Sequence, residues 1–90
     1  MNRKKIHELL DLMLEIHERG KGVDGFPYVG IDFSNYGHRI TLYACENGFS
    51  SGDFDLHERI ETDAELDNAI ILVGVLLEMA VDKTEDECCM

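Results

Sequence analysis

The chain has 90 residues, of which 44% are hydrophobic, which is enough for one hydrophobic core, so we expect a single domain. Its formal net charge of −11 is unevenly spread, because residues 1–22 carry a balance of +1 and residues 23–90 carry −12. Such a field repels phosphates and argues against direct binding to nucleic acid or to an anionic membrane.

The three cysteines do not form the pattern of a disulfide framework, because their number is odd and Cys88 and Cys89 are adjacent. This usage is typical of a reducing compartment, so a cytoplasmic location is expected. The apolar run Ala69–Leu77 is far short of the roughly 20 residues that span a bilayer. The first residues also lack the continuous apolar segment of a signal peptide, so neither secretion nor membrane insertion is expected.

The first predicted element is an amphipathic helix from Arg3 to Arg19. Its apolar residues recur at helical spacing, with acidic residues on the opposite side, which is typical of a surface helix with one buried face. Gly20 and Gly22 then follow the last periodic residue and predict the end of the helix.

From Tyr28 the apolar residues alternate, which predicts a half-buried strand, and the turn residues Ser34–His38 lead into a second strand through Cys45. The turn Glu46–Gly52 leads to a third strand that ends near Ile60, so the middle of the chain predicts a meander. The side chains expected on its buried face are apolar: Val29, Ile31, Phe33, Ile40, Leu42, Phe54 and Leu56.

Thr62 and Glu65 have the spacing of a capping box and predict the start of a second helix, which we expect to end near Val81. Residues 82–90 are then expected to form an acidic, disordered tail, which leaves residues 1–81 as the domain. The predicted fold is α+β, in the order α-β-β-β-α, with both helices on one face of a three-stranded antiparallel meander.

The second helix is apolar around most of its circumference. Beyond its core-facing residues it carries a second apolar strip, and one sheet face cannot cover both. We expect this strip to be a homodimer interface or a partner-binding surface; the alternative is that the first helix covers it. The strip consists of Ile71, Leu72, Val75 and Met79.

A partner-binding surface is also predicted from the sheet face opposite the core and from the acidic run that follows. Tyrosines beside arginine are common in protein contacts, and seven carboxylates between Asp53 and Asp67 could attract a basic partner or imitate a phosphate backbone. Structural alternatives are cross-strand stabilisation and a solvated acidic face. The predicted binding residues are Tyr28, Arg39, Tyr43, Asp53, Asp55, His57, Glu58 and Glu61.

No catalytic, cofactor or metal motif is recognised. The His-Glu pairs, such as His7-Glu8, lack the second histidine four residues on that a zinc protease needs, and no glycine-rich phosphate loop or nucleophile elbow is present. The expected function is therefore non-catalytic protein binding. The alternatives are a small metal-dependent hydrolase that uses His57 with neighbouring carboxylates, and a purely structural homodimer.

The order of elements over residues 3–81 resembles double-stranded-RNA-binding domains. Those domains place basic residues at the start of their second helix, whereas this chain has Glu61-Thr62-Asp63-Ala64-Glu65, so their activity does not carry over. The stretch 28–37 also resembles hairpins of small uncharacterised proteins encoded by bacterial prophages. That resemblance implies an accessory protein of a mobile element, a class that includes acidic inhibitors of host nucleases, and a basic nucleic-acid-binding protein as its partner.

Overall fold

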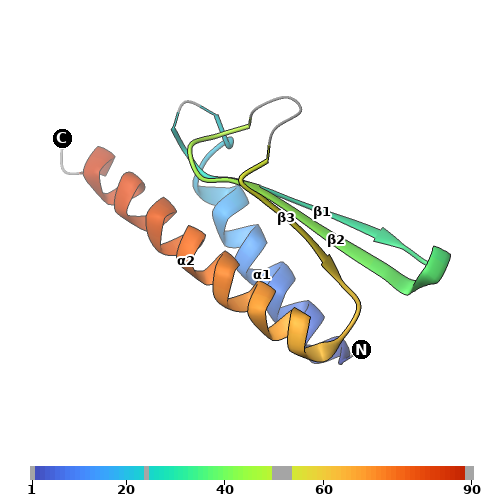
Figure 1. Cartoon of the computed structure of the whole chain (residues 1–90). Coiled ribbons are helices and arrows are strands. Elements are labelled where there is room, and N and C mark those ends of the chain that lie inside the picture. Colours follow the sequence, from blue (N-terminus) through green and yellow to red (C-terminus); the bar gives the residue numbers. More distant parts are fainter. Residues whose placement is uncertain (1, 24, 50–53, 89–90) are drawn as a thin grey trace.

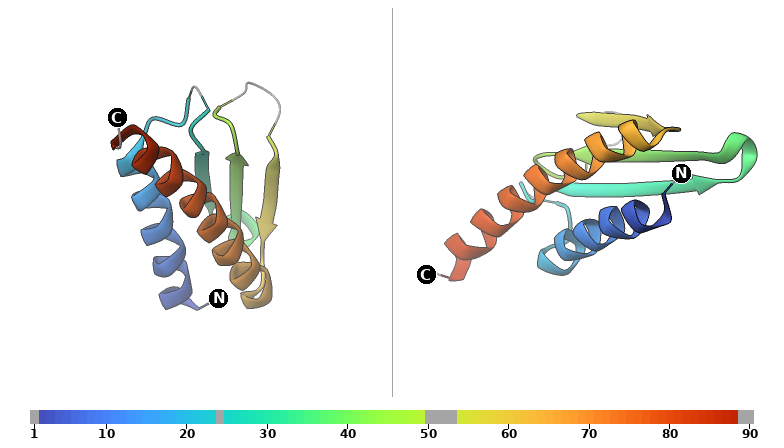
Figure 2. Two further views of the ribbon diagram at one scale, coloured as in Figure 1. Left: turned by 90° about the vertical axis from the view of Figure 1, so that its left-hand side faces the viewer. Right: turned by 90° about the horizontal axis from the view of Figure 1, so that it is seen from below.

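The structure is a computed structural model that describes residues 2–23, 25–49 and 54–88. Within these ranges the chain forms α1 (Arg3–Arg19), β1 (Tyr28–Ser34), the 3-10 turn η1 (Tyr36–His38), β2 (Arg39–Cys45), β3 (Leu56–Ile60) and α2 (Asp63–Cys88). The strands form an antiparallel sheet in the order β1-β2-β3. Both helices lie on the same face of this sheet, which confirms the predicted α-β-β-β-α fold (Figures 1 and 2).

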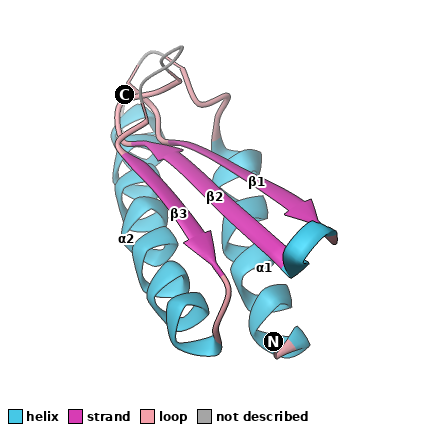
Figure 3. Cartoon of the chain, turned by 45° about the vertical axis from the view of Figure 1, so that its right-hand side comes forward, coloured by secondary structure: helices cyan, strands magenta, loops and turns pink. Residues whose placement is uncertain are grey.

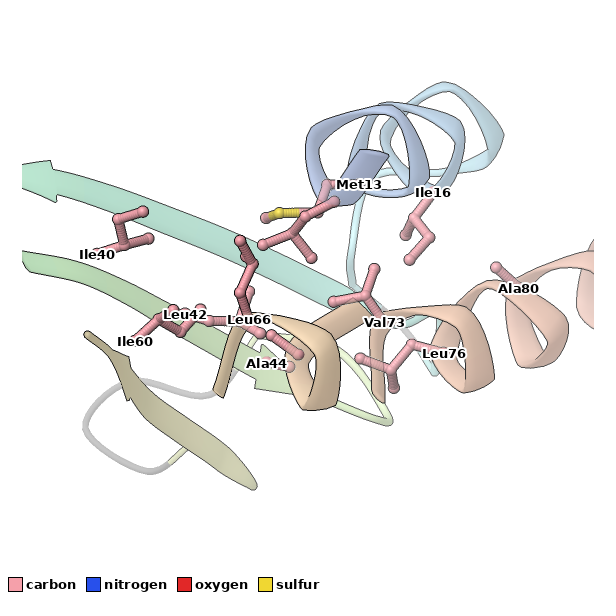
Figure 4. Packing of buried hydrophobic residues seen from close by; sticks show 12 residues of the cluster. Met13, Ile16, Ile40, Leu42, Ala44, Ile60, Leu66, Val73, Leu76 and Ala80 are labelled. Carbon is pink, nitrogen blue, oxygen red and sulfur yellow. The ribbon is translucent and has the colours of Figure 1, made fainter. Parts of the chain in front are cut away.

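The hydrophobic core lies between the sheet and the two helices. Central strand β2 contributes Ile40, Leu42 and Ala44, each less than a tenth exposed, and both helices turn their apolar faces toward them. Figure 4 shows the residues of this core at close range. Strand β3 adds Ile60, and the helices supply the rest of this core: Leu9, Met13 and Ile16 from α1, and Leu66, Ala69, Val73, Leu76 and Ala80 from α2.

The two helices are tied together at their N-terminal ends. The Asn2 side chain caps α1 by accepting hydrogen bonds from the backbone amides of Lys4 and Lys5, and the Asn2 backbone amide donates to Asp63 Oδ1 at 2.8 Å. Lys5 Nζ lies 2.9 Å from Asp67 Oδ1, one turn further along α2. Lys5 Nζ also donates a hydrogen bond to Asp67 Oδ2 at 3.1 Å, and this bond raises the pKa of Lys5.

The predicted capping box at the start of α2 is present in part. The Thr62 hydroxyl accepts a hydrogen bond from the Glu65 backbone amide at 3.2 Å, as the pattern requires. The Glu65 carboxylate accepts from the backbone amide of Glu61 at 3.3 Å, one residue before the expected donor.

Two phenylalanines expected in the core lie elsewhere. Phe33 is 51% exposed, because the β1–β2 hairpin extends beyond the layer of helices (Figure 3). Phe54 precedes β3, which begins only at Leu56, and its ring lies 5.1 Å from that of Tyr43 on the opposite face of the sheet. The alternation expected for the third strand therefore holds from Leu56 to Ile60 and does not extend back to Phe54.

The end of α2 was also predicted wrongly. The helix continues past Val81 to Cys88, so the expected disordered tail is helical over residues 82–88, and residues 89 and 90 lie outside the described residues. The segment after Val81 contains neither Gly nor Pro, so nothing in it forces the helix to stop. The Lys83 ammonium donates a hydrogen bond to the backbone carbonyl of Gly25 and joins this part of α2 to the loop after α1. In the described part of the chain, neither helix combines the length and hydropathy needed to cross a lipid bilayer.

Candidate functional site

The second apolar strip of α2 is largely open to solvent. Ile71 is 65% exposed, Val75 is 51% exposed and Leu72 is 38% exposed, whereas Met79 is partly buried against the core. The first helix does not cover the three exposed residues, because α1 packs on the other flank of α2 (Figure 2). Helix α1 therefore does not shield Ile71, Leu72 or Val75.

A groove runs beside this strip, between α2 and the edge strand β3. It consists of two hollows of about 300 and 160 Å³ that share Leu72. Its apolar wall is built from both elements and from the end of β2: Ala44, Leu56, Ile60, Ala69, Ile71, Leu72, Val75 and Leu76. The helical stretch from Glu65 to Val75 that borders the groove is about 15 Å long at the α-helical rise per residue.

The rim of this groove is acidic. Glu58 and Glu65 border the hollow nearer the start of α2, while Glu46 and Asp55 border the other one. Arg59 is the only basic residue among those that line the two hollows. Helix α2 contributes no basic side chain before Lys83, which is held by the Gly25 carbonyl. Apolar side chains bordered by carboxylates favour a partner that is both apolar and positively charged.

The outer face of the sheet, away from the helices, carries a cluster of aromatic rings at the end of the sheet nearest Cys45. Tyr28 lies edge-on to Phe49 at 5.1 Å between ring centroids, Tyr43 lies 5.1 Å from Phe54, and His57 stacks on Tyr43 at 4.9 Å. The alternation along β2 places Cys45 on this outer face, yet it is only 3% exposed. Tyr28, a member of the ring cluster, lies directly opposite Cys45 in the pairing of β1 with β2.

Tyr28 also has a local packing role. Its hydroxyl lies 2.8 Å from the position that a Cβ atom would occupy at Gly30, so the tyrosine ring lies along β1 over the glycine. An aromatic ring over a glycine in a strand replaces the packing that the missing side chain cannot provide. Part of the aromatic content of this face therefore has a structural explanation.

The predicted partner-binding residues do not form one surface. Tyr28, Tyr43 and His57 share the outer ring cluster. Glu58 faces the helix side, because it pairs with Leu42, and borders the groove with Asp55.

The remaining predicted residues lie at the other end of β2 or outside the described ranges. Arg39 Nε lies 4.0 Å from Glu61 Oε1, and both side chains are about half exposed. This is a surface ion pair, which contributes little to stability. Asp53 lies outside the described residues.

His57, on which the hydrolase alternative depends, is exposed on the outer face and stacked on Tyr43. Among the residues that the structure describes, no three His, Cys, Asp or Glu side chains are grouped closely enough to hold a metal ion. The ring contacts therefore give His57 a place in the aromatic cluster.

Several residues of the groove and of the ring cluster were not identified from sequence. Glu46 and Glu65 were assigned to a turn and a helix cap, and Phe54 was assigned to the core. One signal could have identified the acidic rim from sequence. The turns at both ends of the third strand are acidic, and both must lie near the helix that follows this strand. Phe49 carried no comparable signal, since turn residues have no fixed face.

Comparison of the chain with protein-family models, with curated proteins and with solved structures found no match.

Proposed function

We propose that this protein is a non-catalytic binding module whose α2–β3 groove holds a basic amphipathic helix of a partner protein. The observation that carries the proposal is the open strip of Ile71, Leu72 and Val75, which lies beside four rim carboxylates. An amphipathic helix could lay its apolar side chains on this strip and direct lysines or arginines toward the rim. The bordering length of about 15 Å corresponds to about three helical turns of such a partner.

The rim charge favours a basic partner over a second copy of the chain at this groove. In a symmetric contact between two α2 helices, Glu65 and Glu78 of each copy would approach acidic residues of the other, with no lysine or arginine from residues 63–82 to compensate. Like charges brought together at an interface oppose association. The expected homodimer through Ile71, Leu72, Val75 and Met79 remains a prediction, and charge argues for the heterologous partner.

The partner class that we propose is a basic nucleic-acid-binding protein. The excess of acidic residues after position 22 supports this choice, because spaced carboxylates compete for lysines and arginines that otherwise contact phosphates. Such a role suits an accessory protein of the phage type, which is the class that the hairpin resemblance suggests.

A labelled model peptide tests the groove directly. The probe is a helical peptide with leucines on one face and lysines on the other, and its binding is followed by fluorescence anisotropy at low and high salt. We expect Val75→Glu to weaken binding by about tenfold, which corresponds to about 1.4 kcal/mol. The double variant Glu46→Gln with Glu58→Gln should weaken binding by about fivefold, because each surface charge contributes at most about 1 kcal/mol to the binding free energy.

A matched control separates the groove from the overall charge of the chain. Glu15→Gln with Glu18→Gln removes the same number of exposed carboxylates from α1, away from the groove. This control should leave binding within about twofold of wild type, since screened charges beyond the Debye length of about 8 Å contribute little at physiological salt. Equal losses for both double variants, or no loss for Val75→Glu, would mean that the peptide senses net charge alone and that the groove is not its site.

A further inference from the structure

A second surface, at the free edge of β1, has properties different from those of the groove. In the described part of the chain β1 pairs with β2 alone, so its other edge carries backbone groups without a strand partner. Proteins commonly protect such edges with lysine, proline or a bulge. The seven residues from Tyr28 to Ser34 contain neither lysine nor proline, and their pairing with β2 is continuous.

The flank beneath this edge is apolar. A hollow of about 240 Å³ lies between α1 and β1, and its residues include Leu14, which is 53% exposed, and the half-buried Val29 and Ile31. Phe33, further along the same side of the strand, is 51% exposed. A free strand edge and an uncovered apolar flank therefore adjoin one another.

Charge distinguishes this flank from the groove. The residues that line the hollow include no Asp or Glu, and His17 is the titratable group among them. Residues 1–22, which contain α1, carry a balance of +1 in a chain of net charge −11. For so acidic a chain, this flank is a surface on which a second copy can dock with few carboxylates at the contact.

We propose that two copies of the chain associate through antiparallel pairing of their β1 strands, centred on Ile31. This register pairs all seven residues, from Tyr28 opposite Ser34 of the second copy to Ser34 opposite Tyr28. It also places Phe33 opposite Val29 of the other copy, so that the exposed phenylalanine covers the hollow beside Leu14. Asp32, the acidic residue of the strand, lies opposite Gly30 of the other copy and diagonally across from Asp32 of that copy.

The dimer has a continuous six-stranded sheet, with both pairs of helices on the same face. It leaves both α2–β3 grooves open, because β3 lies at the opposite edge of the sheet from β1. The assembly therefore presents two grooves for partner helices. The association is independent of the proposed function, since neither surface contributes residues to the other.

Sedimentation velocity over a range of protein concentrations tests this association, with a reducing agent present to exclude disulfides through Cys88 and Cys89. The wild-type protein should shift from the mass of one chain toward twice that mass. Leu14→Glu should raise the dissociation constant by about tenfold or more, since it places a charge in the apolar contact. The matched variant Ile71→Glu, at an exposed apolar position of α2, should dimerise as the wild type does.

Hydrogen exchange on the wild-type protein provides a second readout that needs no variant. Alternate amides of β1 point to the free edge, so their protection should increase with protein concentration, while that of β3 amides should not. A wild-type chain that stays monomeric at the highest concentration would overturn the proposal. So would loss of the dimer in Ile71→Glu with its retention in Leu14→Glu, which would assign self-association to α2. Peptide binding by the Leu14→Glu variant tests the groove separately.

Discussion

Two valines on α2 provide a direct test of which side of this helix is buried in the isolated chain. Val73 is fully buried and Val75, two residues later, is 51% exposed. Replacing either by alanine removes the same atoms and improves helix propensity by the same amount, about 0.5 kcal/mol. The difference between the two variants therefore isolates burial.

The magnitudes follow from the exposed fractions. Loss of two buried methyl groups costs about 1.6 kcal/mol at Val73, with an added cost for the cavity, and about half as much at Val75. After the gain in helix propensity, we expect Val73→Ala to lower the free energy of unfolding by about 1.5 kcal/mol and Val75→Ala to lower it by about 0.3 kcal/mol. For a domain of this size the difference corresponds to roughly 5–10 °C in Tm.

Urea and thermal unfolding, followed by circular dichroism at several protein concentrations, measure both variants. Equal losses of stability would refute the reasoning, because they would require Val75 to be as buried as Val73. If the loss at Val75 also grew with protein concentration, the α2 strip would be buried in a dimer. In that case the groove would bind a second copy of the chain rather than the basic helix proposed above.

Three further predictions concern local contacts. Thr62→Ala should lower the free energy of unfolding by about 1 kcal/mol in urea titrations, because it removes the hydroxyl that caps α2, whereas Thr62→Ser should retain most of it. Gly37→Ala should cost about 1–2 kcal/mol by the same assay, because Gly37 has φ of +70° and alanine is strained there; a neutral effect would contradict that backbone conformation. Asp67 raises the pKa of Lys5, so the protonated lysine stabilises the fold below its unfolded-state pKa of about 10.4, and this stabilisation is lost as the pH rises through the higher folded-state pKa. The stability advantage of the wild type over Asp67→Asn should therefore shrink at alkaline pH, and a constant difference would refute the pairing.

The order of elements was predictable because each one has a local signal. Alternation from Tyr28 and the Thr62-Glu65 spacing are read from neighbouring residues, and the structure confirms both elements. The exposure of Phe33 was not predictable, since it depends on how far the hairpin extends beyond α1. The place of Phe54 depends on where pairing of β3 begins, and the loop before that strand has no period of its own.

The candidate site was predictable only in part. The apolar strip containing Ile71 and Val75 followed from helical periodicity, because the surplus of apolar positions on α2 is visible in the sequence. The groove was not predictable, since residues such as Glu46 and Glu65 are far apart in the chain and border different hollows of the same groove between β3 and α2. The sequence identified Glu58 only as part of the acidic run, and its place beside the groove depends on strand alternation, which turns it toward the helices.

Because Cys45 is buried on the outer face, the rate at which its thiol is labelled reports opening motions of the sheet. A thiol reagent can reach Cys45 only when the groups that cover it move aside or the chain unfolds, because the residue is 3% exposed. In a chain with Cys88 and Cys89 replaced by serine, the labelling rate therefore reports the free energy of that opening. Comparison of this energy with that of global unfolding shows whether the cover of Cys45 opens locally or only when the core on the opposite face unfolds.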